Sequence, residues 1–350
     1  MHRLLIVDDS PYYRMRFAKI FARSEALMVA GVADDGDVAI RRIIELKPDI
    51  VLLDLMMPRL DGFGVLRWAM AHQPLPIVVC SSFSDRERVF KALELGAVDF
   101  LLKPSPRASQ QTSALETQIV RCVEEVAGAK PATVSIISKD AKAAVLAAER
   151  EARTAEVELI CMAASTGGPS AIQKLMAELP RSLRVPILIV QHMPVGFTQP
   201  FAERLNALSH YTVREAGDGE PLRRHHAYIA PAGRHATVAS DGESRVIRIE
   251  ATAEDAMADT FHLPSADAVF ESAAAAMGDR LLAVVLTGMG DDGARGAEAV
   301  RAAGGHVLAE SNESAVVFGM PRAVIERGAA NAMLPLAAMP QVLLAYAEKE

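Results

Sequence analysis

Short apolar runs alternate with helix-like segments along both halves of the 350-residue chain. In the first half, these runs predict strands at HRLLIVDD, ALMVAGVAD, PDIVLLD, LPIVVCSS and AVDFLLK. Each run is apolar throughout, which is typical of parallel strands that are covered on both faces. Helical segments such as GDVAIRRIIELK lie between the runs. The pattern predicts a doubly wound βα domain whose site lies at the carboxyl ends of its strands.

A second βα series begins near residue 157, with predicted strands at VELICMA, VPILIVQH, AYIAP, LLAVVLTG and GHVLAE. The segment HATVASDGESRVIRIE places Asp-Gly between two alternating runs, which predicts an antiparallel hairpin at a sheet edge. Residues 128–156 lose the β signal and are rich in Ala, Lys and Glu, which indicates a partly helical linker. We therefore predict an α/β chain with doubly wound parallel-sheet domains at 1–127 and 157–350.

Composition narrows the class of protein. The formal net charge of −7 gives no support for a nucleic-acid partner. The three cysteines, Cys80, Cys122 and Cys161, lack metal-type spacing and suit a reducing compartment. No secretion signal and no apolar run of membrane-spanning length is visible. We expect a cytoplasmic globular protein without direct membrane insertion, and we expect it to be a monomer.

Polar residues follow the predicted strands of the first half. Asp8 and Asp9 end the first strand, Asp54 ends the third, and Ser81 and Lys103 follow the fourth and fifth. In a doubly wound sheet these residues meet on one rim, where the carboxylates suit a hard divalent cation. With Mg²⁺ holding a phosphoryl donor, one carboxylate can act as a nucleophile and form an acyl phosphate. Each aspartate taken alone has a second interpretation as a helix N-cap or turn residue.

The second half also places reactive residues at predicted strand ends. Ser165 lies in AASTGG, His192 in VQHMPVG, and Asp291 and Asp292 in LTGMGDDGARG. A serine hydroxyl needs a base to take its proton, and the base needs a carboxylate to orient it, so the set predicts a nucleophilic triad. Ser165 is otherwise interpreted as a helix N-cap and His192 as a hydrogen-bonded core histidine. Residue chemistry alone predicts acyl transfer and no narrower reaction.

The residues next to these positions predict anion stabilisation. Thr166 and the two glycines after it can present backbone N–H groups at a helix start, and Gly288, Met289 or Gly290 can supply a donor from the facing loop. The stretch GMGDDG is also compatible with a tight turn or a phosphate loop, although it lacks the full nucleotide-binding patterns. The adjacent pair His225-His226 suggests an exposed turn entering a strand rather than a metal site.

The first half, over about residues 1–127, resembles the receiver domain of response regulators, which has a flavodoxin-like fold. The resemblance is carried by Asp8-Asp9, Asp54 with MMPRLDG after it, Ser81, Phe100 and Lys103-Pro104. It implies that Asp54 accepts the phosphoryl group and that Asp8, Asp9 and Asp54 hold Mg²⁺. It also implies that Ser81 and Phe100 move together as a switch, with Lys103 beside the phosphoryl group, and that a chemotaxis histidine kinase is the phosphodonor.

The second half resembles the Rossmann-like catalytic domain of the chemotaxis protein-glutamate methylesterases, on the stretches AASTGGPSA, VQHMP, AYIAPAGRH, LPSADAVFES, LTGMGDDGA and SAVVFGMP. The resemblance implies that Ser165 is the nucleophile, His192 the general base and Asp292 the orienting carboxylate, with Thr166 and the Met289 N–H near the oxyanion. Asp292 is preferred to Asp291 because it matches the Asp-Gly of the family pattern. No cofactor is expected at this esterase site.

The combined resemblance implies hydrolysis of γ-glutamyl methyl esters on methyl-accepting chemoreceptors and deamidation of receptor glutamines. It also suggests that the unphosphorylated receiver occludes the Ser165 site. The alternatives are a non-catalytic receptor-binding scaffold controlled by a receiver domain and, more remotely, a transcriptional regulator. One departure from the family pattern is Glu310-Ser311, which stands where a Gln-Asp pair is common. We expect this difference to change how receptor helices are held.

Overall fold

The computed structural model describes residues 1–82, 86–104, 112–128, 139–242, 244–250 and 263–347. The chain divides into two compact units, Met1–Pro131 and Ala132–Glu350. Both are α/β units built on a parallel sheet, as the apolar runs predict. Among the described residues, the structure contains no helix with the length and apolar character needed to cross a membrane.

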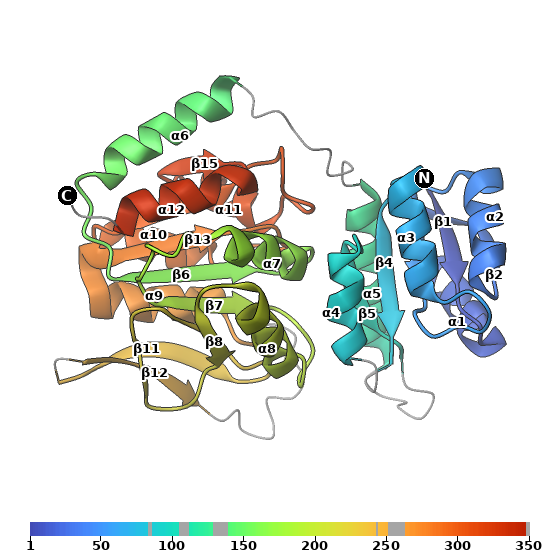
Figure 1. Ribbon diagram of the computed structural model, residues 1–350, viewed down its shortest axis with the longest axis horizontal. Helices are drawn as coiled ribbons and strands as arrows, with labels where there is room; N and C mark the ends of the chain where they lie inside the picture. The colour runs from blue at the N-terminus through green and yellow to red at the C-terminus, as the bar shows by residue number, and fades with distance from the viewer. Residues whose placement is uncertain (83–85, 105–111, 129–138, 243, 251–262, 348–350) are drawn as a thin grey trace. The chain divides into compact units, whose positions relative to one another are not determined.

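The N-terminal unit has one five-stranded parallel sheet with the order β2-β1-β3-β4-β5 (Figure 1). This order confirms the doubly wound fold. All five strands predicted in this half are present. The elements are β1 (His2–Val7), α1 (Pro11–Phe21), β2 (Leu27–Ala33), α2 (Gly36–Leu46), β3 (Ile50–Leu53), α3 (Gly62–His72), β4 (Ile77–Ser81), α4 (Arg86–Glu94), β5 (Asp99–Leu102) and α5 (Thr112–Gly128).

The C-terminal unit has a seven-stranded parallel sheet with the order β15-β14-β13-β6-β7-β10-β8. Its main elements are β6 (Leu159–Ala164), α7 (Gly168–Glu178), β7 (Ile187–Gln191), α8 (Thr198–Leu208), β8 (Thr212–Glu215), β10 (His226–Ile229), α9 (Ala266–Met277), β13 (Leu281–Val285), α10 (Ala294–Ala302), β14 (His306–Glu310), α11 (Met320–Glu326), β15 (Ala332–Leu334) and α12 (Met339–Ala347). Short 3-10 turns lie at Gly278–Arg280 and Leu336–Ala338.

The central strands β7, β6 and β13 decide where a site can form. The chain leaves β6 toward β7 on one side and later returns to place β13 on the other side. The crevice at such a reversal of strand order, beyond the carboxyl ends, is the usual binding position in doubly wound sheets. All three strands are fully buried, so the residues that follow them start from a rigid base.

The predicted antiparallel hairpin is present as β11 (His235–Asp241) and β12 (Ser244–Glu250). We predicted that it would lie at the edge of a sheet, but it does not join the main sheet. Instead, β12 pairs with β9 (Glu220–Pro221) in a separate three-stranded sheet. One face of the hairpin is apolar and packs against α9, so the hairpin supports that helix.

Part of the predicted linker is an ordered helix, α6 (Lys139–Ala152), which packs along α12 and β15 of the C-terminal unit (Figure 1). The Glu151 carboxylate on α6 lies 3.1 Å from Nδ1 of His306 and also accepts a hydrogen bond from Asn331. The helix is therefore part of the C-terminal unit. The predicted domain boundaries at 127/128 and 156/157 remain predictions.

All three cysteines are free thiols in the two cores, with Cys80 on β4, Cys122 on α5 and Cys161 on β6. Burial raises the pKa of each thiol, because a thiolate loses its hydration there. Since a thiolate is the reactive form of cysteine, these side chains are protected from ordinary thiol reagents.

Candidate functional site

Ser165 follows β6 directly and is partly exposed, in the crevice between the strand ends. Its N–H donates to Thr287 O at 3.0 Å, and its carbonyl accepts from the N–H of Gly168 at 2.8 Å. The N-cap position of α7 is Gly167, with φ of +75°, and the helix start has no side-chain cap. The structure therefore does not support the interpretation of Ser165 as a helix cap.

His192 stands beside Ser165 because β7 runs parallel to β6 with Ala164 opposite Gln191. The N–H of His192 donates to Ala164 O at 3.1 Å. The fully buried Gln191 side chain joins both residues, since its Nε2 donates to Ser165 O at 3.0 Å and to His192 O at 2.9 Å. Sequence reasoning missed Gln191; a polar residue at the end of the apolar run ILIVQ was the available signal.

The imidazole of His192 is bonded to a carboxylate from the third central strand. Its Nε2 lies 2.9 Å from Oδ2 of Asp292, in the loop after β13. Asp291 next to it is exposed. The structure thus brings Ser165, His192 and Asp292 to the ends of three adjacent strands, with Asp292 and not Asp291 facing the histidine. Their catalytic roles remain proposals.

The N-terminus of α9 holds the Asp292 carboxylate. Its oxygens accept hydrogen bonds from the N–H of Ala266 at 2.7 Å, the N–H of Asp267 at 2.9 Å and the hydroxyl of Ser265 at 3.0 Å. Burial raises the pKa of Asp292, but the bonds from His192 and these N–H groups outweigh it and lower the pKa to about 2. Asp292 is therefore a fixed anion at neutral pH, which suits the orientation of an imidazole.

Helices α9 and α10 are linked by two carboxylates, each of which accepts hydrogen bonds from the N-terminus of the other helix. Asp267, in the first turn of α9, accepts from the N–H of Gly293 at 2.9 Å and the N–H of Gly296 at 2.7 Å, both at the start of α10. Asp292, just before α10, in turn accepts from the first turn of α9. Each carboxylate satisfies N–H groups that a helix start leaves unpaired. Sequence reasoning did not identify Ser265 or Asp267, although both lie in the quoted stretch LPSADAVFES.

The wall behind Ser165 is made by the loop after β13. Gly288 approaches so closely that a side-chain carbon there would lie 2.9 Å from Cβ of Ser165. The hydroxyl of Thr287 lies 2.9 Å from Thr166 O, and Thr166 is buried at the start of α7. Met289 follows Gly288 and is partly exposed. Thr166 and Met289, the predicted oxyanion residues, therefore lie on the two segments that flank Ser165.

Glu310, at the end of β14, is fully buried behind the same loop. Its Oε2 accepts from the N–H of Thr287 at 2.8 Å, and its Oε1 accepts from the hydroxyl of Ser314 at 2.8 Å. Burial raises the pKa of Glu310 to about 7, against the opposing effects of the two hydrogen bonds and of Lys174. The Glu310 side chain has no exposed surface that could contact a receptor helix, and the expectation that it changes how receptor helices are held stays a prediction.

The N-terminal unit gathers its predicted site residues on one rim. Oxygens of Asp8, Asp9 and Asp54 lie within 4.8 Å of one another. Nζ of Lys103 lies 2.7 Å from Asp8 and 2.8 Å from Asp54. Burial raises the pKa of Asp54 to about 6, although Lys103 opposes this. Three carboxylates with one exposed member are an oxygen donor set that fits a hard divalent ion such as Mg²⁺.

The predicted switch residues lie beside this rim. Ser81 is buried at the end of β4, and its carbonyl accepts from the N–H of Lys103 at 2.9 Å. Phe100 on β5 is also buried and contacts Phe90 edge to face, with the ring centroids 6.2 Å apart. Ser81 is thus bonded to Lys103 through the backbone, Phe100 lies on β5 three residues before Lys103, and their role as a switch remains a proposal.

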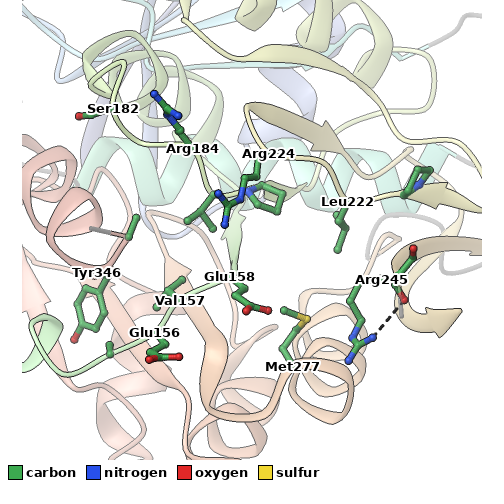
Figure 2. Close-up of a pocket in the computed structure, with 16 residues that line it drawn as sticks. Glu156, Val157, Glu158, Ser182, Arg184, Leu222, Arg224, Arg245, Met277 and Tyr346 are labelled. Carbon is green, nitrogen blue, oxygen red and sulfur yellow. Dashed lines mark hydrogen bonds between the residues drawn. The ribbon is translucent and has the colours of Figure 1, made fainter. Parts of the chain in front are cut away.

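A cavity of about 620 Å³ lies elsewhere in the C-terminal unit (Figure 2). Figure 2 shows side chains of both charges around it, including Glu156, Glu158, Arg184, Arg224 and Arg245. The two glutamates precede β6 and Arg184 precedes β7, so this cavity lies at the amino ends of the strands. It is therefore separate from Ser165, which lies at the carboxyl ends.

Comparison with known families separates the same two units. Residues 160–343 match the family model described as CheB methylesterase, and residues 4–114 match the response regulator receiver domain. A protein-glutamate methylesterase/protein-glutamine glutaminase of Anaeromyxobacter dehalogenans is 44% identical over 99% of this chain and 95% of its own length. The chain belongs to the CheB methylesterase family.

Other members of the CheB family agree with this assignment. A protein-glutamate methylesterase/protein-glutamine glutaminase of Geobacter sulfurreducens is 39% identical over 98% of this chain and 96% of its own length. The crystal structure of the Thermotoga maritima CheB methylesterase catalytic domain matches with a TM-score of 0.51 and 37% identity, covering 54% of this chain and 97% of that domain. The receiver-then-esterase order predicted from the sequence is therefore that of this family.

Proposed function

We propose that this CheB family member hydrolyses γ-glutamyl methyl esters on chemoreceptors and deamidates receptor glutamines, using Ser165, His192 and Asp292. The observation that carries the proposal is the 2.9 Å bond between His192 and Asp292 beside the partly exposed Ser165, where three central strands end. The names of the relatives support the substrate class. We place the reaction in the cytoplasm, on a monomeric enzyme.

The geometry supports a sequence of proton transfers. Since Nε2 of His192 is bonded to Asp292, Nδ1 is the ring nitrogen that takes the Ser165 proton as Oγ attacks the ester carbonyl. The C–O bond to the methoxy group then breaks, and His192 returns the proton so that methanol leaves. Water resolves the acyl-enzyme and gives glutamate. With a glutamine substrate, ammonia leaves in place of methanol.

The oxyanion formed in this attack needs preorganised donors. The N–H groups of Thr166 and Met289 are our candidates, because they flank Ser165 on the start of α7 and on the loop after β13. The positive end of the α7 dipole supports an anion there. Glycine at position 288 lets this loop lie close to Ser165, because a Cβ atom there would clash with the serine.

In the receiver domain, we propose that Asp54 accepts a phosphoryl group from a chemotaxis histidine kinase. Mg²⁺ bound by Asp8, Asp9 and Asp54 would neutralise the charge of the transferred phosphoryl group. Lys103, already bonded to Asp8 and Asp54, would form an ion pair with the new phosphoryl group. Ser81 and Phe100 would then move together and change the surface of the receiver domain. Phosphorylation then relieves inhibition of the Ser165 site by the receiver.

The test is methanol release from methylated receptor membranes by the phosphorylated full-length chain. Ser165→Ala should lower this rate at least about a thousandfold, because covalent catalysis is lost. A fluorophosphonate should also form an adduct that mass spectrometry locates on Ser165. Near-normal methanol release by Ser165→Ala would reject the nucleophile. Receptor binding without methanol release or adduct would instead identify a scaffold.

A further inference from the structure

Glu310 is a buried carboxyl that the proposed mechanism does not use. It is fully buried, yet only one residue, Thr287, separates it from the backbone of Ser165. A buried carboxyl next to a reaction centre affects both its geometry and its electrostatics.

The contacts of Glu310 tie together the two loops that back the site. Its Oε2 holds the N–H of Thr287, whose own carbonyl accepts the Ser165 N–H at 3.0 Å. Its Oε1 holds the hydroxyl of Ser314, which also accepts the N–H of Leu336 at 2.9 Å. The loop with Ser314 continues to Val316, which packs against Gly167 beside Ser165. A change in the hydrogen bonding of Glu310 therefore reaches Ser165 from two sides.

We propose that Glu310 is a positioning residue for Ser165, and that ionisation of its carboxyl slows the attack of Ser165 on a substrate. The inference rests on the proposed role of Ser165 as a nucleophile, but not on the identity of the ester. Glutamine at this position would keep one acceptor for Thr287 and one polar group for Ser314, and it would carry no charge at any pH. The wild-type chain would then differ from such a variant only above the pH at which Glu310 ionises.

The direction follows from charge. The attack of Ser165 develops an oxyanion, and the proposed donor Met289 lies two residues from Thr287, to which Glu310 is bonded. A second negative charge in these partly buried surroundings opposes that oxyanion, and we expect it to lower the rate about tenfold. The neutral acid keeps its acceptor for Thr287 without this opposition. The reaction of Ser165 should therefore be faster with Glu310 protonated.

The surroundings of Glu310 place this ionisation near neutral pH. Lys174 on α7 is the charged side chain that acts on Glu310 and favours its anion, and burial, the larger effect, favours the acid. The adjoining strands β13 and β15, LLAVV and AML, carry no titratable side chain. On the neighbouring loop and helices, charged residues are exposed at the following positions: Glu313, Arg295, Glu298, Arg301, Arg322 and Glu326.

The experiment compares the unphosphorylated full-length wild type with Glu310→Gln, measuring phosphonylation of Ser165 by a small fluorophosphonate between about pH 5.5 and 9. In this probe reaction the Oγ–P bond forms, fluoride leaves and His192 takes the serine proton. Since the two proteins differ only at residue 310, the ratio of their rates reports the effect of this side chain. The ratio of Glu310→Gln to wild type should be near one at low pH and rise about tenfold through neutral pH.

The matched control is Glu313→Gln, which removes the same charge from an exposed position three residues away. Its ratio to wild type should stay near one at every pH. Ser314→Ala removes a donor to the carboxylate, so the midpoint of the wild-type decline should move to higher pH. A ratio for Glu310→Gln that does not change with pH, with Ser165 still labelled, would overturn this inference alone. Absence of labelling at Ser165 in all proteins would overturn both this inference and the proposed nucleophile.

Discussion

At the scale of single residues, the orientation of the His192 ring depends on one carboxylate. Asp292 bonds Nε2 of His192, and three donors at the start of α9 fix Asp292 itself. A ring held in this way presents Nδ1 in a constant direction, as the proposed role of His192 as general base requires.

Asp292→Asn tests this orientation. The amide keeps the shape of the side chain but cannot stabilise a protonated imidazole, and it favours the wrong tautomer of His192. We expect kcat for methyl ester hydrolysis to fall about a thousandfold or more. Asp291→Asn is the matched control, because Asp291 is exposed and adjacent, and its kcat should stay within about twofold of wild type. Equal effects of the two substitutions would contradict the assignment of Asp292.

The sequence allowed these residues to be predicted because strand ends are easy to locate when the strands are apolar throughout, as in LICMAA and ILIVQ. The choice of Asp292 came from the family resemblance and not from spacing. Gln191 and Glu310 could not be assigned in the same way. Their importance lies in which backbone groups they reach, and those groups belong to loops far away in the sequence.

At the scale of elements, α9 and α10 stabilise one another through Asp267 and Asp292. Each carboxylate sits at the start of the other helix, where it pairs with N–H groups and the helix dipole. These reciprocal hydrogen bonds couple the stability of the two helix N-termini to the position of the Asp292 carboxylate. We therefore expect Asp267 to be a positioning residue that acts through Asp292.

Asp267→Ala should uncouple the two helices. It removes the acceptor of two N–H groups at the start of α10, so we expect the free energy of unfolding of the C-terminal unit to fall by about 1–2 kcal/mol. We also expect kcat to fall severalfold while KM changes little, because the loop with Asp292 loses its anchor. Urea unfolding and steady-state kinetics measure the two effects. Glu271→Ala, one turn further along α9 with a partner on the surface, should change neither.

Two strands of the C-terminal sheet escaped prediction for a physical reason. TVRE in β8 and AML in β15 are short, and β8 is exposed at alternate positions because it is an edge strand. Such segments lack the continuous apolar run that identified the central strands. The hairpin was predicted from Asp-Gly, but its pairing with β9 depends on two residues, Glu220–Pro221, that carry no strand pattern.

At the scale of the whole molecule, the position of α6 determines where the chain can be divided. Because α6 packs on α12 and β15, a fragment that begins near Glu156 would lack part of the C-terminal unit. A fragment that begins at Ala132 keeps it. The receiver should be removable only when this helix is left in place.

We expect the fragment from Ala132 to hydrolyse methyl esters faster than the unphosphorylated full-length chain, because it would escape the inhibition that we propose for the receiver. We expect the fragment from Glu156 to unfold at a lower temperature, because it loses the contacts of Glu151 with His306 and Asn331. Methanol release and thermal unfolding measure the two effects. Equal rates for the Ala132 fragment and the unphosphorylated full-length chain would count against inhibition by the receiver.

The burial of all three native thiols has a practical consequence for studying this regulation. Surface cysteines introduced one on each unit can carry spin labels in an otherwise unaltered chain, because Cys80, Cys122 and Cys161 are shielded from the labelling reagent. Distances between such labels, recorded before and after a phosphoryl mimic is added, would test whether phosphorylation changes the separation of the two units, without any disturbance of either core.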